Sequence, residues 1–146
     1  MKIAVASDEK TFLTDVLLGE LKARGHELVL FGPIASTDTE LDWPETSSNA
    51  ARAVASGAVD QGIVCCWTGT GASIAANKVQ GIRAALCADA ETAAGARRWN
   101  DANVLALSLR TTSEALLGEI LDAWFAAEPS AEEDDRANVE HVDSLG

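Results

Sequence analysis

Short apolar runs alternate along the chain with longer segments in which apolar residues recur at helical spacing. The short runs are continuous rather than alternating, which is typical of strands in a parallel sheet that is covered on both faces. Five runs are predicted to be strands, at residues 2–7, 26–32, 61–66, 82–87 and 103–109. Helices are predicted at residues 11–25, 44–57, 72–78, 89–99 and 111–128.

This order of elements predicts one architecture. Five successive β–α units are typical of a single-domain α/β fold, here a Rossmann-like doubly wound sandwich with a five-stranded parallel sheet. The length of 146 residues also favours one domain. We expect residues 1–128 to form this Rossmann-like domain, and Pro129 to begin a segment of different character.

The C-terminal segment, residues 129–146, is strongly acidic. From Glu128 onward the chain has seven acidic residues and one basic residue, Arg136, so this stretch contributes −6 of the net charge of −12. Val139, Val142 and Leu145 recur every three residues and would line one face of a short helix. Two interpretations stay open: a solvated tail, or a helix that packs on the body or on a partner subunit.

The excess of acidic residues narrows the classes of partner. Nucleic acids and anionic membranes are bound through basic surfaces, so neither is expected as a partner. No run of about 18 apolar residues is present, so no membrane-spanning helix is expected. The N-terminus turns polar too early for a signal peptide. Cys65, Cys66 and Cys87 suggest neither a disulfide framework nor a zinc site. We therefore expect a reduced, cytoplasmic protein.

Candidate chemistry lies in the loops after the strands. In an open parallel sheet, ligands bind beyond the carboxyl ends of the strands. Gly69 and Gly71 directly precede a predicted helix, whose free amide groups and dipole favour a phosphate or a developing oxyanion. Three loops are expected at this edge, at residues 7–11, 65–73 and 89–101.

Cys66 stands directly before the glycine-rich turn. A thiol near a helix N-terminus can have a lowered pKa and act as a base or a nucleophile. The alternative is that Cys65 and Cys66 are both small core residues, as free cysteines usually are. The alternation of side chains along a strand argues against both lying on the same buried face.

The string TGTGASIAANKVQGIRAALCADAETA, followed by NDANVLALSLR, resembles the ribose-5-phosphate isomerase B / galactose-6-phosphate isomerase family. IAVASDEK at the start and DWPE at 42–45 fit the same family more loosely. The resemblance covers most of the chain up to about residue 126. It implies an enzyme that interconverts aldose and ketose phosphates through a cis-enediolate, as a homodimer or a dimer of dimers. It also implies that no metal or nucleotide cofactor takes part.

The resemblance further implies roles for individual residues. Cys66 would be the base that moves a proton between C1 and C2, and Thr68 would help to open the sugar ring. Asp8 would bind ring hydroxyls and Asn100 would line the pocket. Arg110 and Arg136 would bind phosphate, with one of them able to come from the partner subunit. The enediolate oxygens would be held by the backbone amides of Gly69, Thr70, Gly71, Ala72 and Ser73.

Several positions depart from the family pattern. The family's His after Asp8 is Glu9, the Gly after its Cys is Trp67, its ring-opening His is Trp99, and its Tyr is Trp43. A C-terminal Arg pair, four residues apart in the family, aligns as Arg136 and Glu140. An indole cannot accept a proton from a sugar hydroxyl, but it can stack on the C–H surface of a sugar. Glu9, Trp43, Trp67 and Trp99 therefore join the candidate substrate-binding residues.

These departures leave the enolisation machinery in place and weaken ring opening and phosphate binding. We expect a sugar-phosphate isomerase of altered substrate, acting on an open-chain or short sugar phosphate such as a tetrose. Two alternatives remain: an isomerase or epimerase of a less usual sugar derivative, and a catalytically weakened chain that binds a sugar phosphate or another subunit. A flavodoxin-like carrier or a response regulator is the alternative at the level of fold, although the sequence has no acidic triad.

Overall fold

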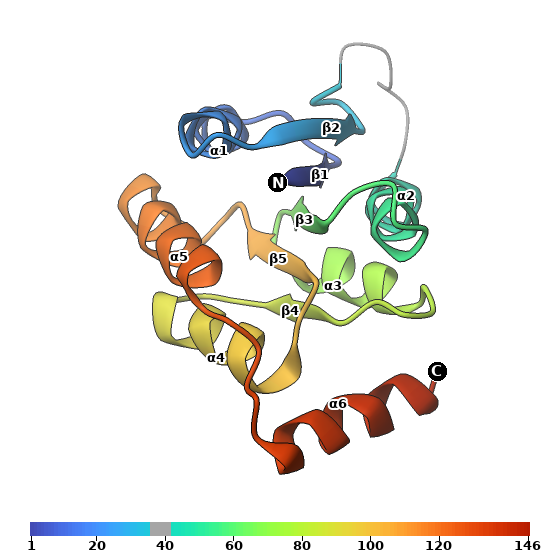
Figure 1. The fold of residues 1–146 in the computed structure, drawn as a ribbon. Coiled ribbons are helices and arrows are strands. Elements are labelled where there is room, and N and C mark those ends of the chain that lie inside the picture. Colours follow the sequence, from blue (N-terminus) through green and yellow to red (C-terminus); the bar gives the residue numbers. More distant parts are fainter. Residues whose placement is uncertain (36–41) are drawn as a thin grey trace.

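The computed structural model describes residues 1–35 and 42–146. Most of the loop expected at residues 33–43 falls on residues 36–41, which lie outside the described residues. In the described part, strands and helices alternate as the hydrophobic pattern predicts (Figure 1). They are β1 (Lys2–Ser7), α1 (Phe12–Ala23), β2 (Glu27–Phe31), α2 (Trp43–Ala55), β3 (Gln61–Cys66), α3 (Thr70–Asn77), β4 (Ala84–Leu86), α4 (Ala90–Asn100), β5 (Val104–Ser108), α5 (Glu114–Ala126) and α6 (Glu133–Ser144).

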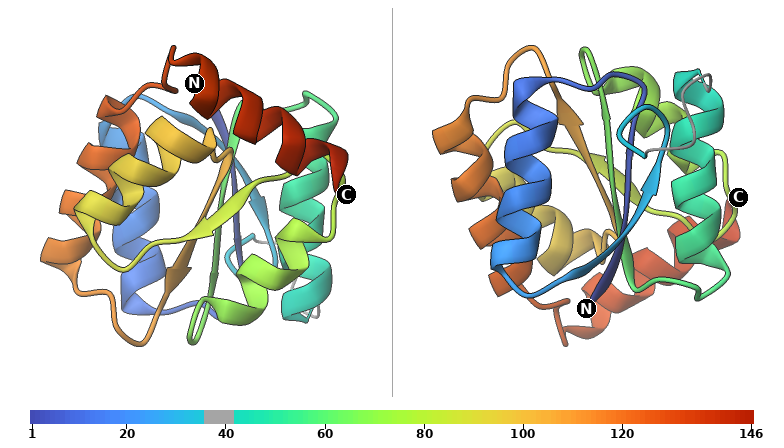
Figure 2. Two further views of the ribbon diagram at one scale, coloured as in Figure 1. Left: turned by 90° about the horizontal axis from the view of Figure 1, so that it is seen from below. Right: turned by 90° about the horizontal axis from the view of Figure 1, so that it is seen from above.

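The five strands form one sheet in the order β2-β1-β3-β5-β4, and every pair is parallel. Helices α1, α4 and α5 cover one face of the sheet, and α2 and α3 cover the other (Figures 1 and 2). The expected single-domain, doubly wound α/β sandwich with a five-stranded parallel sheet is therefore confirmed.

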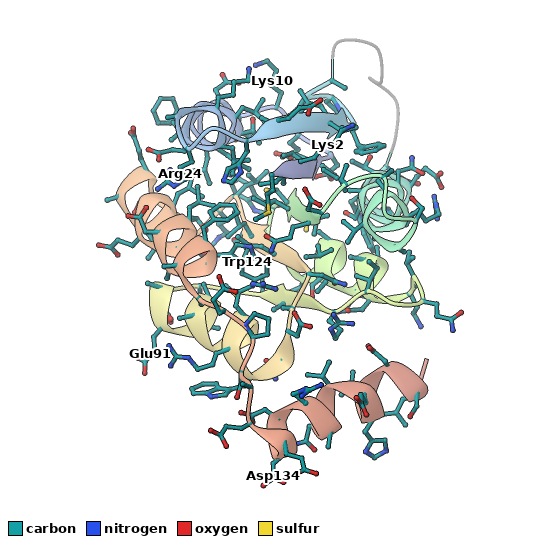
Figure 3. The ribbon with its side chains drawn as sticks, viewed as in Figure 1. Lys2, Lys10, Arg24, Glu91, Trp124 and Asp134 are labelled. Carbon is teal, nitrogen blue, oxygen red and sulfur yellow. The ribbon has the colours of Figure 1, made fainter. Side chains whose placement is uncertain are left out.

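The two faces of the sheet are packed differently. The face under α1, α4 and α5 is filled by large side chains such as Leu17, Leu105 and Leu117. Trp124 points inward from α5 (Figure 3), and its indole N–H donates to Oε1 of Gln61 at 2.9 Å. The face under α2 and α3 is lined mainly by alanines, which lets these two helices lie close to the strands. Helix α3 is thereby held against the end of β3.

Four of the helices begin at a side-chain N-cap. The oxygens of Thr11, Asp42, Asp89 and Ser113 each accept a backbone N–H three residues ahead. Such caps satisfy amides that have no partner inside the helix. In the helix predicted at 111–128, Ser113 is the cap and the helix proper begins at Glu114. Helix α3 differs from these four, because its N-cap is Gly69 and no side chain caps it.

Residues 133–144 form a helix, α6, which lies on α4 at the end of the sheet where the chain's N-terminus lies (Figure 2). None of its residues is buried. Val139 is half-buried, whereas Val142 and Leu145 are exposed. In the described ranges, no helix combines the length and the apolarity needed to cross a membrane.

Candidate active site

The carboxyl ends of β1, β3 and β5 meet at one point of the sheet. From β1 the chain crosses to β2 on one side, and from β3 it moves to β4 and β5 on the other. Ligands of open α/β sheets bind at such a switch point. Ser7 pairs with Cys65, and Cys66 pairs with Ser108. Asp8, which follows Ser7, is therefore next to Cys66.

The turn between β3 and α3 depends on Gly69. Its φ is +78°, in the left-handed region that favours glycine. A Cβ at this position would lie 2.6 Å from Cδ1 of Leu86 and 2.9 Å from the carbonyl oxygen of Leu107. Only a glycine lets the chain pass this close to β5. The turn brings the first residues of α3 directly over the end of β3.

The two adjacent cysteines lie in different surroundings. Cys65 faces the core under α1, α4 and α5 and is 1% exposed, whereas Cys66 faces α2 and α3 and is 6% exposed. Burial, with smaller contributions from Cys66 and Asp8, raises the pKa of the Cys65 thiol to about 12. The Cys66 sulfur instead accepts the N–H of Ala72 at 3.4 Å. Both thiols are thus buried, but only Cys66 touches the first turn of a helix.

Main-chain hydrogen bonds brace the loop after Cys66. The N–H of Leu109 donates to the carbonyl of Cys66 at 3.0 Å, and the N–H of Arg110 donates to that of Trp67 at 2.9 Å. The hydroxyl of Ser108 also donates to the Trp67 carbonyl, at 3.1 Å. These bonds hold Arg110 beside the loop. Its guanidinium forms no ion pair with the acidic residues of the described ranges.

Asp8 and Glu9 place two carboxylates at the same edge. The Oδ1 atom of Asp8 is buried and has no hydrogen-bond partner among the described residues. Burial raises the pKa of Asp8, and the charge of Glu9 adds to this, although a backbone N–H partly offsets the shift. Glu9 itself is exposed, and its N–H donates to the Ser7 hydroxyl at 3.3 Å. Asp8 is therefore the partly buried acceptor of this pair.

Two tryptophans flank the glycine-rich turn. The ring of Trp43, at the start of α2, lies against Gly71, where a Cβ would come within 3.0 Å of it. Trp67 follows Cys66 directly and is 53% exposed. The hydroxyls of Thr68 and Thr70 are hydrogen-bonded to one another at 2.9 Å. Aromatic surface and hydroxyl groups thus surround the uncapped end of α3.

The remaining candidate residues lie elsewhere in the chain. Helix α4 starts at the carboxyl edge of the sheet, where the parallel strands end, and runs back toward the amino edge, where they begin. Trp99 and Asn100 therefore lie at the amino edge, about 17–20 Å from the carboxyl edge, which is the length of a typical strand. Only the beginning of the third expected loop, at Asp89, lies at the carboxyl edge. Trp99 covers Gly95 and lines a groove together with Arg136 of α6. One chain therefore divides the sequence-predicted residues into two groups, at opposite edges.

The structure also adds a residue that the sequence analysis did not select. Ser108 ends an apolar strand, and its hydroxyl bridges the Trp67 carbonyl and the N–H of Thr111. A polar residue at the carboxyl end of an apolar run was the available signal. Within residues 1–35 and 42–146, no three His, Cys, Asp or Glu side chains come together as ligands of a metal ion would.

Comparisons with known proteins place the chain among sugar-phosphate isomerases. The chain is 43% identical over 128 residues to ribose-5-phosphate isomerase B of Escherichia coli, covering 87% of this chain and 85% of that protein. It is 44% identical over 86 residues to D-erythrulose-4-phosphate isomerase of Pectobacterium atrosepticum, covering 59% and 57%. The solved structure of Clostridium thermocellum ribose-5-phosphate isomerase B superposes with a TM-score of 0.90 at 40% identity, covering 99% and 97%.

Fold and relatives together define a sugar-phosphate isomerase. The family model described as Ribose/Galactose Isomerase matches residues 3–142, and the chain belongs to this family. The resemblance drawn from the glycine-rich turn and the NDANVLAL segment is thereby confirmed.

The close approach of Gly69 to β5 can be tested with a matched pair of glycine variants. Gly57 also has a positive φ, of +79°, but a Cβ there would meet nothing within 4 Å. We expect Gly57→Ala to lower the free energy of unfolding by about 1–2 kcal/mol, from backbone strain alone. Gly69→Ala should cost about 3–5 kcal/mol, because steric overlap with Leu107 adds to that strain.

Urea unfolding measures both values, and isomerase assays should show that kcat/KM falls about 100-fold in Gly69→Ala only, since the site is displaced. Equal losses in the two variants would contradict the steric account.

Proposed function

We propose that the protein is an aldose–ketose isomerase that works through a cis-enediolate, with the Cys66 thiolate as the base. The sulfur takes the proton from the carbon next to the substrate carbonyl, and the C–H electrons form the carbon–carbon double bond of the enediolate. Returning the proton to the former carbonyl carbon, with a proton shift between the two oxygens, completes the isomerisation. The observation that carries this proposal is the contact between the Cys66 sulfur and the N–H of Ala72.

Helix α3 supplies the electrostatic part of the proposal. Enolisation places negative charge on the carbonyl oxygen, and backbone N–H groups fixed in advance stabilise such a charge. The first turn of α3 has no side-chain cap, and the amides of Thr70 and Gly71 have no hydrogen-bond partner among the described residues, so these two can bind a ligand at the end of the sheet. The N–H of Ala72 instead donates to the Cys66 sulfur, and that of Ser73 donates to the Gly69 carbonyl at 3.1 Å, which corrects the expectation that all five amides from Gly69 to Ser73 face the substrate. In this proposal Asp8 accepts substrate hydroxyls, and Thr68 takes part in proton transfer to the sugar oxygens.

We propose that Arg110 provides one contact to the substrate phosphate. Its backbone is fixed on the Trp67 carbonyl at 2.9 Å, and its side chain is exposed at the carboxyl edge. Arginine suits phosphate because its planar guanidinium can donate two parallel hydrogen bonds. Within the chain's overall charge of −12, this local cation makes an anionic substrate possible.

We further propose that the working unit is a homodimer, or a dimer of such dimers. Trp99, Asn100 and Arg136 are candidate site residues, yet they lie at the opposite edge from Cys66 in their own chain. A two-fold axis pairs the same two surfaces twice, so the amino edge of one copy can complete the carboxyl edge of the other. Exposed Ile74, Leu86 and Trp99 would be covered in such a pair.

The preferred substrate in this proposal is a four-carbon sugar phosphate. A 4-phosphate blocks the hydroxyl that would close a furanose ring, so a tetrose phosphate is already open and needs no ring-opening acid. This matches a chain with Trp99 at the position of the ring-opening His, because an indole cannot accept the proton. In this proposal the bulky Trp67, where the family has Gly, narrows the site beside Cys66, and the relative named D-erythrulose-4-phosphate isomerase supports the same substrate. We place the protein in the cytoplasm, a reducing compartment that suits its three free cysteines.

The base can be tested by changing one sulfur at a time. We expect Cys66→Ser to lower kcat by about 10²–10⁴-fold with a sugar phosphate, because a serine hydroxyl is far too weak an acid to supply the base. Cys65→Ala is the matched control, since that thiol is sealed in the core with a pKa of about 12. Its kcat should stay near the wild-type value. A Cys66→Ser enzyme with wild-type turnover would remove the proposed mechanism.

The shared site can be tested by mixing two inactive variants. Cys66→Ser inactivates the carboxyl edge of its chain, and the double variant Asn100→Ala, Arg136→Ala inactivates the amino edge. When the two chains are refolded together, half of the dimers pair unlike copies and each contains one intact site, so activity should recover to about a quarter of wild type. If the mixture shows no more activity than its two components, while sedimentation still detects dimers, the sites are not shared.

The substrate assignment is tested by comparing kcat/KM for tetrose and pentose phosphates. We expect the four-carbon substrate to be preferred by roughly tenfold or more, because the pentose phosphate must first open its ring without a basic group at position 99. Trp67→Gly should narrow this difference by admitting the longer chain. A higher kcat/KM for ribose 5-phosphate would refute the four-carbon assignment and leave the isomerase assignment intact.

A further inference from the structure

Helix α6 is held on the body by very few contacts. It buries none of its residues, and a groove of about 680 Å³ separates part of it from the α3–β4 loop and the end of α4. Just before the helix, the N–H of Ser130 donates to the carbonyl of Arg98 at 2.7 Å. Near its other end, Asp143 meets Arg83. Two polar attachments, one at each end, therefore hold α6 on the body, together with the half-buried Val139 against α4.

Arg83 is a prepared partner for this attachment. It lies just before β4, its side chain is 17% exposed, and its Nε donates to the carbonyl of Asp101 at 2.8 Å. Nη2 also lies 3.5 Å from Oδ2 of Asp101. These contacts belong to the body and do not involve α6. They fix the guanidinium before the helix docks, so little side-chain entropy is lost when Asp143 binds.

Asp143 binds the third nitrogen of that guanidinium, Nη1. Nη1 of Arg83 lies 3.0 Å from Oδ1 and 3.1 Å from Oδ2 of Asp143. The other acidic residues of α6 form no ion pair with the basic residues of the described ranges. Among the acidic residues of α6, only Asp143 therefore forms an ion pair with the body in the described ranges.

The register of the helix links this ion pair to Arg136. Asp143 follows Arg136 by seven residues, which is about two helical turns, so both side chains leave α6 on nearly the same side. Holding Asp143 sets the rotation of the helix about its axis. Arg136 is thereby turned toward the groove that it shares with Trp99.

We infer that Arg83 and Asp143 are positioning residues, whose ion pair fastens α6 so that Arg136 can contact the anionic group of the substrate. The inference rests on the proposed role of Arg136 in anion binding. Arg83 and Asp143 touch no substrate in this account. Their loss therefore weakens binding and leaves the proton transfer at Cys66 unchanged.

The test compares three variants of exposed acidic residues on α6. Asp143→Ala removes the ion pair, Asp143→Glu keeps a carboxylate, and Asp134→Ala removes a charge that points away from the body (Figure 3). Hydrogen exchange of the α6 amides is measured together with kcat and KM. In Asp143→Ala the exchange accelerates and KM rises about fivefold, a modest effect because the pair is partly exposed, while kcat is unchanged. Asp143→Glu and Asp134→Ala both stay near wild type.

Two results would overturn the inference. One is α6 exchange in Asp143→Ala no faster than in Asp134→Ala. The other is faster exchange with an unchanged KM, in an enzyme whose Arg136→Ala variant does show a raised KM. If Arg136→Ala itself leaves KM unchanged, the proposed anion contact fails instead, and the exchange data still decide whether Asp143 fastens the helix.

Discussion

The approach of Gly69 to the backbone of Leu107 decides where helix α3 begins. A side chain at this position would overlap the Leu107 carbonyl of β5, so the turn between β3 and α3 could not lie this close to β5. With glycine, the first amides of α3 lie over the end of β3, and the Cys66 sulfur receives the N–H of Ala72. The alanine-lined face under α2 and α3 keeps the helix close to the sheet. This one constraint brings the sulfur and the amides together, and the pairing of β1 with β3 places Asp8 beside them.

The chain also separates its candidate residues in a way that has consequences for assembly. Asp8, Trp67 and Arg110 stand with Cys66 at the carboxyl edge, whereas Trp99, Asn100 and Arg136 stand at the amino edge. A helix that connects two parallel strands runs back from the end of the first to the start of the second, so the two ends of α4 lie at opposite edges. A second copy is the simplest way to bring both groups to one substrate. Under that proposal, the placement of α6 by Arg83 becomes part of the site of the other copy.

Much of the fold could be predicted from the sequence because continuous apolar runs mark buried parallel strands. The prediction for residues 61–66 coincides with β3, whereas the run at 82–87 yields only a three-residue β4. There the side chain of Asn77 bonds both the N–H and the carbonyl of Ala84, and Asn103 receives the N–H of Arg83. Side chains thus replace a neighbouring strand at the edge of the sheet. Such long-range contacts leave no periodic signal.

The site could be predicted where it depends on local chain geometry, and less well where it depends on the direction in which a helix runs across the sheet. A glycine-rich turn before a helix is a local feature, and Gly69 lies in such a turn, but α3 begins at Thr70, two residues earlier than predicted, so Gly71 lies inside the helix. Alternation along β3 correctly placed Cys65 and Cys66 on opposite faces, but both are buried because helices cover both faces. The resemblance groups Trp99 with Trp43 and Trp67 because Trp99 stands at the position of the family's ring-opening His. Its distance from them follows from the length and direction of α4, which a motif does not carry.

The central claim is that Cys66 relays a proton between neighbouring carbons of the substrate. It is tested most directly by running the isomerisation in deuterium oxide and following the label at C1 and C2 by nuclear magnetic resonance. The account predicts that the wild-type enzyme introduces deuterium at the carbon that receives the proton, and that Cys66→Ser introduces almost none. Deuterium incorporation by Cys66→Ser at the wild-type rate would contradict it.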